Sequence, residues 1–178
     1  MRAITLLFFL FLFQIPEGHS QVEETIEPEY IRTIQFKGAS AQSRLPIIEL
    51  GQKLQLSFDD IIGNEADYFY TIAHFNFDWT PSDLSKGEYL DGFDDVRIET
   101  YENSFNTLQL YSNYKLSIPN RETRAIKKSG NYLLRIFNDD GEIVFSRKFM
   151  VLERVLSVEV EIKRSRIIKN IDQQQVVQ

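Results

Sequence analysis

Acidic and aromatic side chains are concentrated in one passage of the chain, EYLDGFDDVRIETYENSFNTLQLYSNYKLSIPN, which runs from Glu88 to Asn120 and holds only two basic side chains. Carboxylates beside rings can bind and cleave sugars, Asp-rich loops can bind calcium, and exposed Tyr and Phe can dock a protein partner. Asp is also common in turns, because its side chain accepts hydrogen bonds from nearby backbone N–H groups. Turn chemistry is the preferred interpretation, and calcium binding and glycoside chemistry stay open, for three groups of carboxylates: Asp91, Asp94 and Asp95; Asp59 and Asp60; Asp139 and Asp140.

Nucleophilic catalysis lacks its usual residues in this sequence. The chain has no Cys, and its two His are His19, in the expected leader, and His74, in the middle of an aromatic segment. A hydrogen-bonded structural role is the expectation for His74. A zinc site would need ligands from Asp and Glu almost alone, which suits zinc poorly. Because a Gly-rich phosphate loop and a Gly-x-Ser-x-Gly elbow are also missing, we predict a protein that is not an enzyme and needs no cofactor.

The aromatic side chains outnumber what a single core of this size can hide. They make up 13% of the chain, and half of the residues in a strand face away from the core. Some rings should therefore lie on the surface, where Tyr, Trp and Phe act as anchors for a protein or as stacking platforms for a sugar. The candidate partner-binding residues are Trp79, Tyr89, Asp91 and Phe93.

The segment EYLDGFDD, which carries three of these candidates, is expected to form a surface loop. Asp91 and Asp94 should accept hydrogen bonds from the backbone of that loop, while Tyr89 and Phe93 should anchor it to the core. In this interpretation the carboxylates hold a turn and not a metal ion.

Polar and apolar residues alternate through most of the chain, and this period of two predicts strands. In LQLSF, for example, Leu54, Leu56 and Phe58 fall on one face. The turn residues NDDG, between NYLLRIF and EIVFSRKFMV, predict a hairpin, because Gly can take the positive φ that a short loop demands. Other strands are expected at Tyr30 to Phe36, Asp67 to Phe77, Thr107 to Tyr111, Tyr114 to Ile118 and Val155 to Ile162.

The fold class follows from the number and spacing of these strands. Short strands joined by Gly, Pro, Asn and Asp turns, without a convincing amphipathic helix, predict an all-β protein built as an antiparallel immunoglobulin-like β-sandwich. An open barrel is the alternative.

The first 20 residues have the layout of a secretory signal peptide, with Arg2, an apolar run from Ile4 to Phe13, and small residues at Gly18 and Ser20. The apolar run is too short to span a membrane. We therefore expect an exported protein that begins at Gln21 after cleavage and has no membrane span. Its formal net charge of −6 disfavours nucleic acid and anionic lipid as main partners, and the lack of Cys favours a bacterial envelope compartment.

Eight segments follow one another in the order typical of the type IX secretion system plug protein family. From about Ile31 to Glu153 the chain resembles that family, which is a specific signal because so many segments match in series. The segments are IRTIQF, PIIELG, LQLSFDD, YFYTIAHFNFDWTPS, EYLDGFDD, ENSFNTLQLYSNYKLSIPN, SGNYLLRIFNDDGE and VFSRKFMV.

The resemblance implies a periplasmic, β-rich protein, peripheral to the outer membrane, that seals the periplasmic side of the translocon β-barrel of the type IX secretion system. It brings no catalytic residue with it. After the signal peptide at 1–20, it implies a plug-type N-terminal β-sandwich domain at 21–153 and the start of a truncated second β-domain at 154–178. The rings and paired Asp residues leave one alternative open, a carbohydrate-binding or glycan-processing β-sandwich of the cell envelope.

Overall fold

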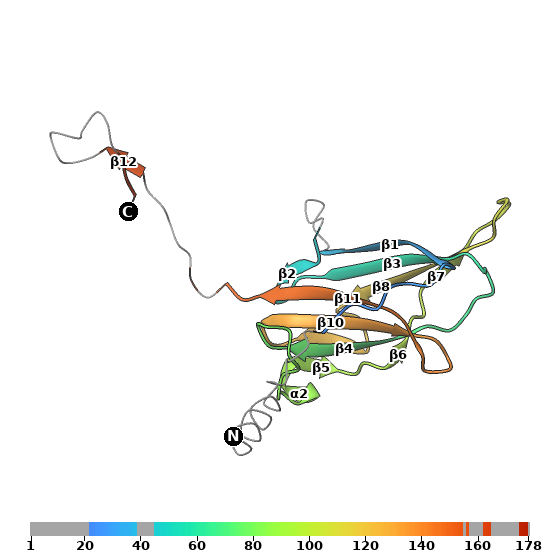
Figure 1. Cartoon of the computed structure of the whole chain (residues 1–178), viewed down its shortest axis with the longest axis horizontal. Coiled ribbons are helices and arrows are strands. Elements are labelled where there is room, and N and C mark those ends of the chain that lie inside the picture. Colours follow the sequence, from blue (N-terminus) through green and yellow to red (C-terminus); the bar gives the residue numbers. More distant parts are fainter. Residues whose placement is uncertain (1–21, 39–44, 155, 157–161, 165–174, 178) are drawn as a thin grey trace, which may run out of the picture.

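Two β-sheets packed face to face make up most of the described chain (Figure 1). The computed structural model describes residues 22–38, 45–154, 156, 162–164 and 175–177. The first sheet contains, in spatial order, β1 (Ile31–Gly38), β3 (Leu54–Asp60), β8 (Ser112–Ile118) and β7 (Tyr101–Asn103). The second contains β2 (Ile47–Glu49), β11 (Ile143–Leu152), β10 (Gly130–Phe137), β4 (Phe69–Phe75) and β6 (Val96–Arg97).

Neighbouring strands in both sheets run antiparallel, except that β2 lies parallel to β11. Within the described residues, no helix is long and apolar enough to cross a membrane. The remaining elements are the helix α2 (Lys86–Tyr89) and two short antiparallel pairs, β5 (Leu90–Gly92) with β9 (Thr123–Ile126) and β12 (Ile162–Arg164) with β13 (Gln175–Val177).

The core lies between the two sheets, and alternation along the strands builds it. In β3 every second residue is buried, as a period of two predicts for a strand with one covered face. The ring of Phe58 in β3 lies 5.2 Å from the rings of Tyr68, Tyr114 and Phe145, so that both sheets contribute to one aromatic cluster. Burying a ring of this size contributes about 1.5–3 kcal/mol, most of which chain entropy offsets.

The hydroxyl groups of this cluster are paired where they reach the end of the core. Tyr68 donates to Asp60 Oδ2 at 2.9 Å, and Tyr114 donates to the carbonyl of Ala66 at 2.6 Å. Burial, together with the Asp60 carboxylate, raises the pKa of Tyr68 far above its usual value. Burial likewise raises the pKa of Tyr114 to about 12. Both hydroxyls therefore stay protonated at neutral pH and hold the β3–β4 connection onto the sandwich.

The all-β class and the antiparallel, sandwich-like sheets are confirmed, while the immunoglobulin-like character stays a prediction. β1, β3, β4 and β8 occupy expected segments, and the hairpin of β10 and β11 surrounds the expected turn. β4 ends at Phe75, before the expected Phe77, because Asp78 Oδ1 accepts the backbone N–H of Thr80 and turns the chain. Most of the strand expected at Val155 to Ile162 lies outside the described residues.

The two ends of the sandwich carry different connections. At one end Asp60 pairs with Ile31 of β1 and with Ser112 of β8, and the turn between β10 and β11 lies at the same end (Figure 1). At the opposite end β1 finishes at Gly38 and β11 at Leu152. We call the end at Asp60 the hairpin end.

Candidate interaction surface

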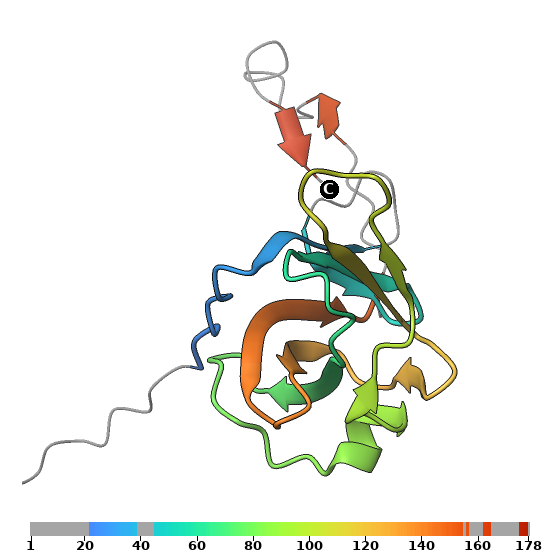
Figure 2. The ribbon, with the colours of Figure 1, turned by 90° about the vertical axis from the view of Figure 1, so that its right-hand side faces the viewer.

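The connection between β7 and β8, residues 104–111, projects beyond the first sheet at the hairpin end (Figure 1, Figure 2). We call these residues the hairpin tip. Its sequence, SFNTLQLY, has no charged side chain. Phe105 is 94% exposed, Leu108 is fully exposed, and Leu110 is more than half exposed. Contiguous apolar side chains in water are uncommon on a monomeric protein and mark a binding surface.

Contacts with the β3–β4 connection hold the hairpin tip in place. The amide of Gln109 donates to the carbonyl of Ile61 at 2.8 Å. Gly63 has a φ of +65°, and a Cβ there would lie 3.1 Å from the Cβ of Leu110, so the two segments touch closely. Across the base of the tip, the backbone N–H of Ser104 donates to the carbonyl of Tyr111 at 2.8 Å. The tip is thus a positioned projection, which lowers the entropy lost when it binds.

The strand expected at Thr107 to Tyr111 is wrong, because these residues belong to the hairpin tip. The Thr107 hydroxyl donates to the carbonyl of Gln109 at 2.7 Å, a local bond typical of turns. β8 begins only at Ser112, where the chain first meets a neighbouring strand. Sequence reasoning missed the tip as a site, although one signal was available: an uncharged run that carries four apolar side chains.

Trp79 lies in the turn after β4, away from the hairpin tip. Its backbone φ is +65°, which is strained for a residue with a side chain. Its half-buried ring lies 6.3 Å from the ring of Phe75 and 4.5 Å from the ammonium group of Lys148. The carbonyl of Trp79 accepts the backbone N–H of Val22 at 3.3 Å. The exposed part of the ring remains accessible to a partner.

Tyr89, Asp91 and Phe93 lie on the connection between β4 and β6, residues 76–95. Tyr89 is only 6% exposed and donates its hydroxyl to the carbonyl of Ile72 at 3.1 Å, which confirms its role as an anchor. Phe93 is 70% exposed, so the expectation that it anchors the segment is wrong. Its backbone N–H already bonds the carbonyl of Glu122, and this bond holds the chain while the ring points outward.

Part of this segment is regular structure, where a loop was expected. α2 begins after Ser85, whose backbone N–H donates to the Glu88 carboxylate at 2.8 Å, as in a capping box. Asp91 and Asp94 do not act as expected, since their partners lie on other segments. Asp91 Oδ1 accepts from Arg124 at 2.9 Å. Asp94 Oδ2 accepts the backbone N–H of Ile72 at 2.8 Å, and its other oxygen accepts from Lys86 at 2.6 Å.

His74 has the hydrogen-bonded role that was expected of it. Its Nδ1 lies 2.7 Å from Ser82 Oγ, and its ring packs edge-on against Tyr132 at 4.9 Å. The ring is also 5.6 Å from the ring of Tyr89. These contacts hold the imidazole of β4 against Tyr132 of β10 and Tyr89 of α2.

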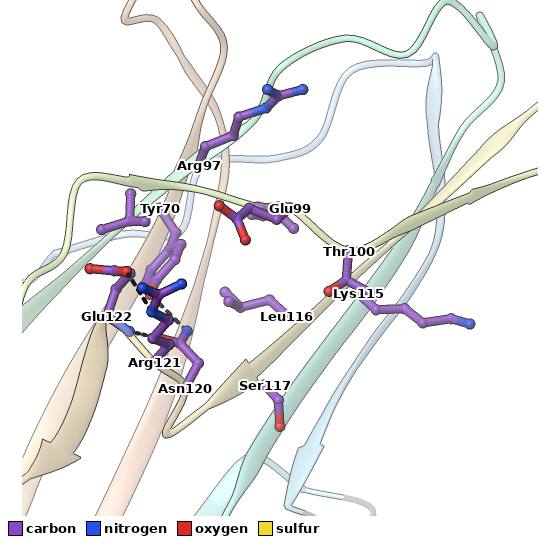
Figure 3. Close-up of a pocket in the computed structure, with 12 residues that line it drawn as sticks. Tyr70, Arg97, Glu99, Thr100, Lys115, Leu116, Ser117, Asn120, Arg121 and Glu122 are labelled. Carbon is purple, nitrogen blue, oxygen red and sulfur yellow. Dashed lines mark hydrogen bonds and ion pairs between the residues drawn. The ribbon is translucent and has the colours of Figure 1, made fainter.

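A small pocket of about 160 Å³ opens beside β6 and β8 (Figure 3). Asn120 donates to the Tyr70 hydroxyl at 2.8 Å, so the polar groups near its floor are already paired. The basic side chains of Arg97 and Lys115 extend away from Tyr70 in this view and form ion pairs outside it, with Asp67 and Glu102. The pocket can admit a small polar molecule.

Comparison with known proteins gives one family and one structure of interest. Residues 31–153 match the family described as type 9 secretion system plug protein, 1st domain. The chain is similar to a crystal structure of a hypothetical protein from Parabacteroides merdae, with 32% sequence identity and a TM-score of 0.71. The similarity covers 89% of this chain and 41% of that one, so the chain spans about two fifths of the length of that structure. No curated protein matches the chain.

Proposed function

Because the chain belongs to the type 9 secretion system plug protein family, we propose that it is a periplasmic, non-enzymatic component of that system. Its role is to bind the outer-membrane translocon β-barrel and to seal the periplasmic side while no substrate passes. The observation that carries this proposal is the hairpin tip, which presents uncharged apolar side chains on a braced projection. A surface of this kind suits docking into an apolar recess of a large protein.

The charge distribution of the hairpin end supports a docking surface made of the tip alone. Phe105 and Leu108 stand clear of the sheet, whereas the charged side chains at the base of the hairpin are paired. Lys115 bonds Glu102, and Glu65 accepts from Tyr101 and Asn103. Desolvating the tip therefore removes no unpaired charge from water, which keeps the cost of association low.

A second surface lies on the connection between β4 and β6, residues 76–95, and includes the residues singled out from the sequence. Trp79 and Phe93 supply partly or largely exposed rings, and Asp91 supplies an exposed carboxylate. Tyr89 supports this surface from below, because it is buried. In the proposal these residues contact the translocon around the primary contact at the tip.

The proposal includes export and a longer domain organisation. Removal of residues 1–20 would release the protein into the periplasm with Gln21 first, and mass spectrometry of the envelope protein tests this. Residues 21–153 form the plug-type domain, and residues 154–178 begin a second β-domain. The family match over 31–153 ends at the same residue as the proposed plug-type domain.

Binding is tested by co-purification of the protein with the translocon from solubilised outer membranes. The double variant Phe105→Ser/Leu108→Ser should lower the affinity about 30-fold or more, as expected for anchors at the centre of an interface. Leu152→Ser is the control, because Leu152 is 52% exposed and ends β11 at the opposite end of the sandwich, outside both proposed surfaces. Equal losses in both variants would refute the tip as the docking surface.

Two further outcomes separate the remaining alternatives. If Phe93→Ala weakens binding and the tip variant does not, the connection between β4 and β6 is the docking surface. Deletion of the gene should make the outer membrane permeable to large antibiotics that it normally excludes. If permeability is unchanged while the translocon is assembled, the sealing role is wrong, and retention on a polysaccharide column then tests the glycan-binding alternative.

A further inference from the structure

β11 has one side that is only partly covered by a neighbouring strand. β10 pairs with it from Ile143 to Val151, but on the other side β2 covers only Met150 to Leu152. The backbone N–H groups of Ser146, Lys148 and Met150 point to that side, because they bond groups outside the ladder with β10. Residues 144–148 therefore form an edge that can accept another strand, and we call it the open edge.

An extended segment before β1, residues 22–27, lies along the open edge. We call it the N-terminal strap; Figure 2 shows it in dark blue beside the orange ribbon of β11. One backbone-to-backbone hydrogen bond joins the two, from the N–H of Ser146 to the carbonyl of Thr25 at 3.1 Å. The other bonds use side chains: the N–H of Thr25 donates to Ser146 Oγ at 2.7 Å, and the N–H of Lys148 donates to the Glu24 carboxylate.

Charge complementarity selects what can occupy the open edge. The strap carries Glu23, Glu24 and Glu27 and no basic residue, whereas the open edge carries Arg147 and Lys148. Arg147 bonds the Glu27 carboxylate at 2.6 Å, and this bond holds the pKa of Glu27 below its usual value. An occupant of the same site must therefore be extended and must place carboxylates at similar spacing.

The strap is held by few contacts, so its removal would leave the core intact. Residues 23–26 are exposed, and the largest of them, Ile26, is 83% exposed. Phe145 and Phe149 of β11 belong to the core cluster between the two sheets. Opening the strap breaks a small number of hydrogen bonds and ion pairs, whereas removal of a core strand would break a whole ladder.

We propose that the open edge is a strand-addition site for an extended acidic segment of a partner protein, and that the N-terminal strap occupies this site in the free protein. The partner segment displaces the strap. Its backbone carbonyls accept hydrogen bonds from the N–H groups of Ser146 and Lys148, and its carboxylates form ion pairs with Arg147 and Lys148. After removal of the leader the strap would be the free N-terminal end of the chain, which allows it to leave without strain elsewhere. This site is separate from the hairpin tip, and only the free end of the strap rests on the leader removal that the proposed function includes.

A peptide with the sequence of residues 22–29, VEETIEPE, is the probe, labelled with fluorescein and followed by anisotropy. It should bind the full-length variant Glu24→Gln/Glu27→Gln about tenfold or more tightly than wild type, because the weakened strap competes less. The matched control Glu23→Gln/Glu29→Gln loses the same charge, and neither residue is bonded to β11; it should behave like wild type. The peptide with all four Glu replaced by Gln should bind about tenfold or more weakly.

Hydrogen exchange locates the bound peptide. The amides of Ser146 and Lys148 should exchange faster in the Glu24→Gln/Glu27→Gln variant and should slow again when the peptide is added. Adding Arg147→Gln to that variant should lower the peptide affinity while leaving the thermal transition cooperative. The proposal is overturned if the peptide does not bind at millimolar concentration, or if it binds without protecting these two amides. No translocon is present in this assay, so its failure would leave the proposed function standing.

Discussion

Adding one methyl group at Gly130 tests the close contact between this residue and the imidazole of His74. Gly130 has a φ of +146°, and a Cβ at this position would overlap His74 Nε2. The imidazole cannot retreat easily, because it is bonded to Ser82 and packed against the rings of Tyr89 and Tyr132. Gly130→Ala should therefore cost about 1–3 kcal/mol from overpacking and about 1–3 kcal/mol more from backbone strain.

Urea denaturation of four proteins separates these two contributions. In the His74→Ala background the added methyl group has space, so Gly130→Ala should cost only the backbone part, and the double-mutant cycle should give a coupling of about 1–3 kcal/mol. Gly141→Ala is the control, since Gly141 has a φ of +78° with nothing near its missing Cβ, and it should cost about 1–2 kcal/mol. A Gly130→Ala cost no larger than this control, or a coupling near zero, would refute the placement of His74.

Three other predictions concern pH, a buried carboxylate and calcium. Burial raises the pKa of Tyr114 to about 12 and raises the pKa values of Tyr68 and Tyr132 further. Because the unfolded chain loses these protons from about pH 10, the stability should be full below pH 10 and should fall as the pH rises from 10 towards 12. A urea midpoint that stays constant across that range would contradict this. Asp94→Ala should cost about 1–3 kcal/mol of unfolding free energy, because it leaves the N–H of Ile72 without its acceptor. Lys86→Met should cost a similar amount, because it leaves the Asp94 carboxylate, which is 3% exposed, without its cation. Equal stability of Lys86→Met and wild type in urea would contradict this. Calcium should leave the melting temperature nearly unchanged, and a rise of several degrees that EDTA reverses would show that the Asp residues bind a metal ion.

Local alternation was sufficient to predict the strands that have a neighbour on each side or a covered face. β3 and β8 were predictable because their apolar residues face one core, and the hairpin of β10 and β11 because its turn needs Gly141 at a positive φ. The same alternation at Thr107 to Tyr111 gave a wrong strand, since Leu108 and Leu110 alternate in a projection with no adjacent strand. Periodicity reports which residues share a face and not what covers that face.

The candidate site was harder to predict than the fold, because exposure depends on contacts that are distant in sequence. Tyr89 and Phe93 are similar rings four residues apart, yet one is buried and the other faces water. The bond from Phe93 N–H to the Glu122 carbonyl decides this, and it joins segments about 30 residues apart. The N-terminal strap shows the same limit, since the bond between Thr25 and Ser146 spans 121 positions and leaves no periodic pattern in either segment.

The position of Trp79 gives the molecule a natural optical reporter. It is the only tryptophan in the chain, its carbonyl accepts the N–H of Val22 at the start of the strap, and the ammonium group of Lys148 lies over its ring. Release of the strap removes both Val22 and the Glu24 carboxylate, which accepts the backbone N–H of Lys148, so the electric field and the solvation at the indole change together. Because excited indole is sensitive to nearby charge and water, the emission of the unlabelled protein should follow occupancy of the β11 edge in real time, without an attached dye.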